Sequence, residues 1–69
     1  MVYSLRKGAS GQEVKRLQDR LGLLVDGSFG PKTDAGVRIY QKARGLVVDG
    51  IAGPKTLGSL GIEVLGGID

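Results

Sequence analysis

Two nine-residue stretches decide the fold of this chain: VDGSFGPKT at residues 25–33 and VDGIAGPKT at residues 48–56. The copies start about 23 residues apart. The similarity extends upstream, where four positions recur at the same spacing: Val14, Gln18, Gly22 and Leu23 correspond to Val37, Gln41, Gly45 and Leu46. A period of this length is typical of a repeated supersecondary unit. The chain is therefore predicted to contain an internal repeat.

Each copy carries the residues of a turn that leads into a helix. The Asp-Gly pair favours a turn, because the carboxylate can accept the N–H two residues on and glycine adopts positive φ without strain. The Gly-Pro pair that follows favours a helix start, since proline at the first helical position loses no hydrogen bond. A calcium loop needs several oxygen ligands, whereas each copy offers one carboxylate, Asp26 or Asp49. We therefore expect turns, with no bound metal and no cofactor.

The helical spacing of apolar residues predicts three helices, at about residues 11–21, 31–44 and 54–60. Each helix is followed by a glycine that can adopt the left-handed conformation that closes a helix; these are Gly22, Gly45 and Gly61. The sequence shows no alternating strand pattern. It predicts an all-α fold, a small three-helix bundle with an internal helix-turn pseudo-repeat.

Four single residues carry further structural expectations. Ser10 and Glu13 fit a capping box, in which each side chain bonds the other's free backbone N–H. Gly36, in the middle of the second helix, costs about 1 kcal/mol relative to alanine; it either permits a close helix–helix approach or is simply tolerated. Phe29, inside the first turn, is expected to plug the core.

The 69 residues are expected to form one domain, with residues 1–9 extended and residues 62–69 as a partly frayed tail. Leu5 would anchor the first segment and Ile62 would pack back on the core. No apolar run approaches the roughly 20 residues of a membrane span, and residues 1–8 lack the apolar region of a secretory signal. We expect no membrane partner, and export by another route or as a module of a larger protein.

The composition argues against an enzyme. The chain has no cysteine and no histidine, so it lacks disulfides, the commonest zinc ligands and the commonest general base. Its serines have no histidine to activate them. Glu13 and Asp19 could be imagined as a glycosidase pair, but they are predicted to lie on the outer face of a helix where nothing raises a pKa. The net charge of +3 favours an anionic partner without identifying one.

The pattern of these residues resembles the peptidoglycan-binding domain found in bacterial cell-wall hydrolases, phage endolysins and spore-cortex lytic enzymes. The resemblance runs from Leu5 to about Leu60. Its matching positions are Leu5, Arg6, Gly8, Gly11, Val14, Leu17, Gln18, Leu21, Gly22, Asp26, Gly27, Phe29, Gly30, Pro31, Thr33, Val37, Tyr40, Gln41, Gly45, Leu46, Asp49, Gly50, Gly53, Pro54 and Thr56.

The resemblance implies a three-helix module without catalysis of its own, which tethers a covalently linked hydrolase to the wall polymer. It implies peptidoglycan, both stem peptide and glycan, as the partner, and the cell wall, outside the cell or in the periplasm, as the place of action. A similar module occurs in the propeptides of matrix metalloproteases, so the fold alone does not identify the ligand. Gly36, Tyr40 and Leu57 depart from the family's usual alanine, phenylalanine and aromatic residue. The departure at Leu57 removes a possible surface for stacking a sugar ring.

Three polar side chains near the apolar stripe are candidate ligand contacts. Gln18 and Gln41 recur in the repeat, and each amide either bonds backbone in a loop or faces a groove. Tyr40 either fills the stripe of the second helix with its ring or offers its hydroxyl at the rim.

The basic residues of the second helix are the other candidates. Arg38, Lys42 and Arg44, with Lys32 near the helix start, form either a solvated face or a cationic rim that pairs with stem-peptide carboxylates. Arg44 is the strongest candidate, because it occupies a stripe position where its stem can pack while its guanidinium reaches out.

A different class of function remains open on the sequence. Three helices with a positive charge resemble small helix-turn-helix nucleic-acid-binding domains. The basic residues are, however, spread over all three predicted helices and interleaved with acids. We therefore expect peptidoglycan and not nucleic acid as the partner, and nothing in the sequence indicates an oligomer, so we expect a monomer.

Overall fold

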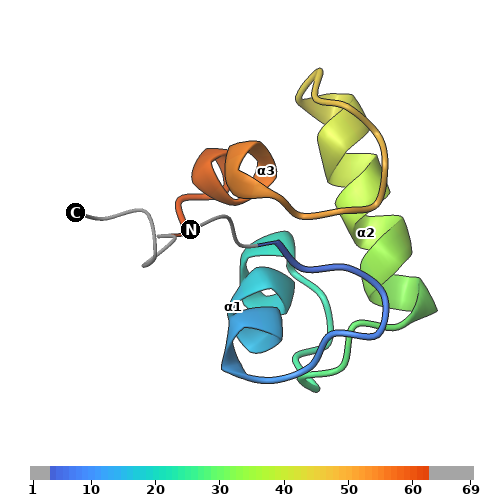
Figure 1. Cartoon of the computed structure of the whole chain (residues 1–69), viewed down its shortest axis with the longest axis vertical. Helices are drawn as coiled ribbons and strands as arrows, with labels where there is room; N and C mark the ends of the chain where they lie inside the picture. The colour runs from blue at the N-terminus through green and yellow to red at the C-terminus, as the bar shows by residue number, and fades with distance from the viewer. Residues whose placement is uncertain (1–3, 63–69) are drawn as a thin grey trace.

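The computed structural model describes residues 4–62, which form three helices and no strand (Figure 1). The helices are α1 (Gln12–Leu21), α2 (Pro31–Ala43) and α3 (Pro54–Ser59). Figure 1 shows α2 on one side of the molecule, with α1 and α3 on the other. The predicted all-α fold is confirmed. The expected extension of residues 1–3 and the expected fraying of residues 63–69 lie outside the described residues.

The helix ends follow from the predicted glycines and prolines. Pro31 and Pro54 stand at the first positions of α2 and α3, where a missing N–H costs nothing. The glycines that follow the three helices, Gly22, Gly45 and Gly61, have φ of 75°, 72° and 78°. In each case the N–H of the residue after the glycine donates to a carbonyl of the last helical turn. These closing bonds are Leu23 to Gln18 at 2.8 Å, Leu46 to Gln41 at 2.8 Å and Ile62 to Leu57 at 2.9 Å.

The start of α1 corrects one expectation. The N-cap is Gly11, with φ 118°, and no side chain caps the helix, so the capping box of Ser10 and Glu13 does not form. Ser10 instead pairs with Ser28 in an isolated antiparallel bridge, and the N–H of Gly11 donates to the carbonyl of Gly27 at 3.0 Å. Backbone pairing with the first turn therefore takes the place of the expected side-chain cap at the start of α1.

The N-terminal segment crosses both turns and links them. Near its start, Leu5 exchanges two backbone hydrogen bonds with Ala52, at 3.0 and 2.8 Å. Further along, the N–H of Gly8 donates to the carbonyl of Phe29 at 3.0 Å, and the N–H of Phe29 donates to Ala9 at 2.9 Å. Turns that are separate in sequence are therefore held by one strand-like segment.

Eight apolar residues from every part of the fold make up the core: Leu5, Val14, Leu17, Phe29, Val37, Ala52, Leu57 and Ile62. Phe29 is the expected plug, with 2% of its surface exposed. Leu57 is completely buried, so the departure from an aromatic residue at this position concerns packing and not an exposed stacking surface.

Two positions on α2 differ from their expectations. Tyr40 is only half-buried and is absent from the core cluster, so its ring lies at the edge and does not fill the stripe. Gly36 does permit a close approach, but the neighbour is not a helix. A Cβ there would lie 2.7 Å from Cδ1 of Leu23, which belongs to the connector after α1.

Candidate functional site

The amides of Gln18 and Gln41 lie inside the two turns, each 1% exposed. The Gln18 oxygen accepts the N–H groups of Asp26 and Gly27, at 3.0 and 2.9 Å. Its nitrogen donates to the Asp26 carboxylate at 2.8 Å, the Ser28 carbonyl at 3.0 Å and the Thr33 hydroxyl at 3.0 Å. This set of bonds uses the donors and acceptors of the amide, so Gln18 organises its turn from within.

Gln41 makes the same five bonds one repeat later. Its oxygen accepts from Asp49 and Gly50, both at 3.1 Å. Its nitrogen donates to Asp49 at 3.0 Å, Ile51 at 2.9 Å and Thr56 at 3.2 Å. The sequence left two alternatives for each glutamine: an amide that bonds backbone in a loop, or an amide that faces a groove. Both amides bond their loops, although Gln41 also borders a surface groove.

The carboxylates of Asp26 and Asp49 complete the two turns. Each accepts the N–H two residues on, from Ser28 at 3.0 Å and from Ile51 at 2.9 Å. These backbone hydrogen bonds are the largest cause of a lowered pKa at both groups, followed by the bond from the glutamine amide. Both carboxylates therefore serve as turn acceptors, in agreement with the turn chemistry expected for the two copies.

Tyr40 and the C-cap residue Arg44 lie together near the end of α2. The Tyr40 hydroxyl and the Ser59 hydroxyl are 2.6 Å apart, which ties the two helices at the surface. The guanidinium carbon of Arg44 stands 5.5 Å from the centre of the Tyr40 ring, within the range of a cation–π contact. Arg44 itself is exposed at the end of α2. The structure thus brings together two of the predicted site residues.

Arg38 and Lys42 lie on a different side of α2, because residues two apart on a helix point in nearly opposite directions. The Nε of Arg38 pairs with the carboxylate of Asp34 at 3.1 Å, and this pair covers Gly50 in the second turn. Lys42 is exposed one turn further on. The six predicted site residues therefore do not form one surface.

Each turn borders a groove built from equivalent positions. The groove beside the first turn has a volume of about 390 Å³ and is lined by Asp26, Ser28, Gly30, Pro31, Lys32 and Thr33. The groove beside the second turn, about 420 Å³, is lined by the corresponding residues and also by Gln41, Leu46 and Val47. The second groove is the more apolar of the two.

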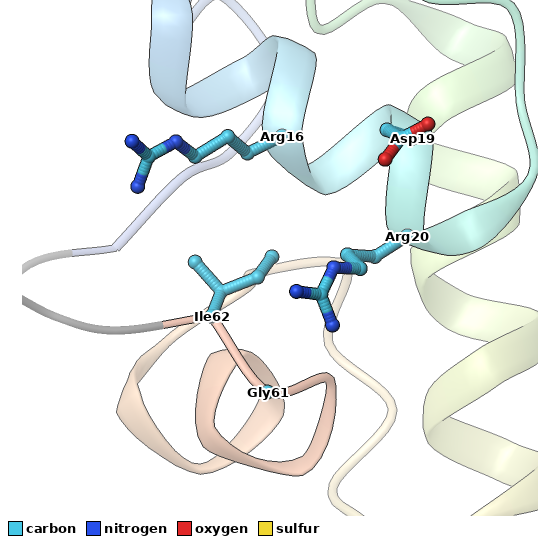
Figure 2. Close-up of a pocket in the computed structure, with 5 residues that line it drawn as sticks. All are labelled: Arg16, Asp19, Arg20, Gly61 and Ile62. Carbon is cyan, nitrogen blue, oxygen red and sulfur yellow. The ribbon is translucent and has the colours of Figure 1, made fainter.

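Another groove, of about 470 Å³, was not predicted from the sequence. It lies between α1 and the segment after α3 and is lined by Arg16, Asp19, Arg20, Gly61 and Ile62 (Figure 2). Figure 2 shows Arg20 extending from α1 toward Gly61 and Ile62, and Arg16 extending to the left above Ile62. The sequence gives no signal for it, because its two walls are about 40 residues apart and its charged residues look like an ordinary solvated helix face.

Within residues 4–62, no group of three or more acidic, histidine or cysteine residues is placed to hold a metal ion. The described helices are also too short and too polar for any of them to cross a membrane.

Comparison with known proteins identifies the class of domain. The model of the family described as "Putative peptidoglycan binding domain" matches residues 10–60, so the chain belongs to this family. A search of curated protein sequences gives no significant match.

Three solved structures share the fold of this chain. A fused Zn-dependent amidase/peptidase/peptidoglycan-binding domain-containing protein from Clostridium acetobutylicum is 31% identical, with a TM-score of 0.85 over 93% of this chain; the match spans 32% of that protein. The SleB N-terminal domain is 42% identical, with a TM-score of 0.81 over 84% of this chain and 88% of that domain. The endolysin of the Burkholderia phage AP3 is 41% identical, with a TM-score of 0.82 over 84% of this chain and 24% of the endolysin.

These comparisons confirm the resemblance found in the sequence. They favour a wall-binding module over a nucleic-acid-binding domain, and a non-catalytic domain over an enzyme. In the relatives that are much longer, the shared domain is fused to other parts of the protein.

Proposed function

We propose that this domain adsorbs to peptidoglycan without cleaving it and holds a linked catalytic domain at the cell wall. The family match over residues 10–60 is the observation that carries the proposal. The relative from Clostridium acetobutylicum joins a peptidoglycan-binding domain to an amidase/peptidase, and this fusion supports the linkage to a hydrolase.

The proposed contact surface is the exposed end of α2, where Arg44 stands over the Tyr40 ring. The guanidinium is free to form a bidentate pair with a stem-peptide carboxylate, and the tyrosine edge offers apolar area beside it. Lys42 and Arg38 add positive charge to the same helix, while Gln41 and Gln18 contribute by holding the turns. Such a small surface favours weak binding by one domain. Retention on the wall would then depend on tethering and on the repeating polymer.

Adsorption to insoluble walls tests this proposal. The domain is mixed with intact walls, with walls stripped of stem peptides and with immobilised DNA, at low and at raised salt. We expect retention on intact walls, loss with salt because exposed ion pairs are screened, weaker retention on stripped walls, and little on DNA. Retention on DNA but not on walls would contradict the proposal, and equal retention on both wall samples would replace the carboxylate contact with a glycan contact.

A pair of arginine variants locates the surface. Arg44→Gln should lower adsorption several-fold, because a charge-assisted hydrogen bond is worth roughly 1.5–3 kcal/mol before solvent screening reduces it. Arg6→Gln is the matched control, since it removes the same charge from an exposed site outside the described grooves. Equal losses for both variants would show that only net charge matters.

A further inference from the structure

The groove between α1 and the end of α3 presents three charged side chains from one helix face. Arg16, Asp19 and Arg20 stand at positions i, i+3 and i+4 of α1 and therefore project to the same side. Ile62, which is 8% exposed, gives the groove an apolar wall opposite them. The groove thus combines two guanidinium groups, one carboxylate and an aliphatic surface.

Contacts across the groove fix the position of Arg20. Its Nη1 donates to the carbonyl of Leu60 at 3.0 Å, which leaves the other guanidinium donors available. Gly61 lies directly beneath this group. It has a φ of 78°, and a Cβ there would stand 3.1 Å from Nη1. The backbone of the α3 end therefore fits against the guanidinium and orients it before any ligand arrives.

The charged groups of this groove form no ion pair within the described fold. Among residues 4–62 the ion pair joins Arg38 to Asp34 on α2, so Arg16, Asp19 and Arg20 have no ion-pair partner in that part of the chain. A simple anion would be attracted by the two arginines and repelled by Asp19. A ligand that carries a carboxylate beside an ammonium would satisfy all three groups.

We infer that this groove binds the zwitterionic end of an amino acid, a carboxylate and an ammonium on one carbon, at the free end of a stem-peptide side chain. The inference rests on the proposed function, because peptidoglycan is the polymer that would supply such a group. Arg16 and Arg20 bind the carboxylate, Asp19 binds the ammonium, and Ile62 contacts the aliphatic chain. The charged side chains of this groove come from α1, whereas those of the Arg44 and Tyr40 surface come from α2 and its end.

Titration of the isotope-labelled domain with soluble tripeptides, followed by NMR, tests the inference. The first probe ends in 2,6-diaminopimelate with a free zwitterionic end; the second has lysine there and so lacks the carboxylate; the third has 2-aminopimelate, which lacks the ammonium. We expect the first probe to shift the amide signals of Arg16, Arg20 and Gly61, and to bind about tenfold more tightly than either of the others, as one lost charge-assisted bond implies. Equal binding of the three probes would overturn the inference.

Variants assign the two charges separately. Arg16→Gln should weaken the diaminopimelate probe about tenfold without a change in melting temperature, because Arg16 is exposed and its side chain makes no hydrogen bond or ion pair within residues 4–62. Arg6→Gln, the matched control, should leave binding unchanged. Asp19→Asn should remove the preference for the ammonium-bearing probe over 2-aminopimelate. Unchanged binding in Arg16→Gln would contradict the assignment.

Wall adsorption separates this inference from the proposed function. If the wild-type domain is retained on walls but none of the probes shifts the groove, the groove assignment fails and the proposed function stands. If the wild-type domain is not retained on walls, the proposed function fails whatever the probes do.

Discussion

The two turns of this domain have the same hydrogen bonds but different surroundings. In both turns, a buried glutamine amide bonds an Asp-Gly pair and a threonine in the first turn of the next helix. The lengths of corresponding hydrogen bonds differ by at most 0.2 Å. Within residues 4–62 the first turn also makes three backbone hydrogen bonds to the N-terminal segment, at Gly8, Ala9 and Gly11, whereas the second turn makes two, both between Ala52 and Leu5.

The surfaces beside the two turns differ at the positions where the two copies have different residues. Ser28 in the first groove corresponds to Ile51 in the second, and only the second groove includes Leu46 and Val47. In the first copy the equivalent connector leucine, Leu23, turns inward and packs on Gly36. The repeated residues therefore hold the backbone, and the unmatched residues decide what each turn offers to a partner.

The largest effect is expected from removing the amides. Gln18→Ala and Gln41→Ala each leave the buried N–H of a turn glycine without its acceptor, which should lower the free energy of unfolding by about 2–4 kcal/mol. Gln41→Ala should cost at least as much as Gln18→Ala, because fewer backbone bonds hold the second turn. Denaturant unfolding measures both losses, and hydrogen exchange at Gly27 and Gly50 locates them.

Gln12→Ala is the matched control for these variants. Gln12 is an exposed glutamine at the start of α1, so its replacement should change stability by less than about 0.5 kcal/mol. If the buried and exposed glutamines give equal losses, the amides do not organise the turns.

The turn acids give a smaller, pH-dependent effect. The pKa values of Asp26 and Asp49 lie below their ordinary 3.8 in the folded protein, so the unfolded chain takes up protons first as the pH falls. Their contribution to stability is complete above pH 3.8 and is lost as the pH falls through the lowered folded pKa values.

Replacing both acids with asparagine checks this sign. Asparagine keeps the shape and an acceptor oxygen but does not titrate. Melting temperatures measured between pH 7 and pH 2 should therefore be lower in Asp26→Asn/Asp49→Asn at neutral pH and converge with the wild type in acid. A constant difference across the range would contradict the linkage. Of the single variants, Asp49→Asn should lose more at neutral pH, since its turn has fewer other bonds.

The sequence was sufficient for the elements that depend on local backbone chemistry. Gly22, Gly45 and Gly61 close the three helices at the predicted positions, each with a left-handed φ. Pro31 and Pro54 mark the predicted starts of α2 and α3. Ser10 was misassigned because its partner, Ser28, comes from a turn that local spacing does not place beside it. A capping motif read from neighbouring residues cannot detect competition from distant backbone.

The candidate sites were less predictable for the same reason. The duplicated glutamines were identified as special, but only the folded turns show that their amides are fully bonded. The predicted basic residues of α2 separate because helical geometry sends Arg38 and Arg44 to different sides. The Arg16 and Arg20 groove depends on the return of Gly61 and Ile62 to α1, which no local pattern encodes.

The smallest expected effect concerns the contact between Gly36 on α2 and Leu23 in the connector before it. Gly36→Ala should gain about 1 kcal/mol of helix propensity, but the new Cβ would stand 2.7 Å from Cδ1 of Leu23. Displacing this half-buried side chain should cancel most of the gain, so the variant should differ from wild type by less than about 0.5 kcal/mol. In a Leu23→Ala background the obstacle is absent, and the same substitution should stabilise by about 1 kcal/mol.

A double-mutant cycle measured by denaturant unfolding isolates this coupling, and the second copy supplies its control. Leu46 occupies the equivalent connector position but lines the open groove, so Gly36→Ala should have the same small effect in a Leu46→Ala background as in the wild type. Coupling of Gly36 to Leu23 and not to Leu46 would show that the Leu23 contact opposes the added methyl group, and not the general loss of a connector leucine. Equal coupling to both leucines, or coupling to neither, would contradict the packing of Leu23 on Gly36.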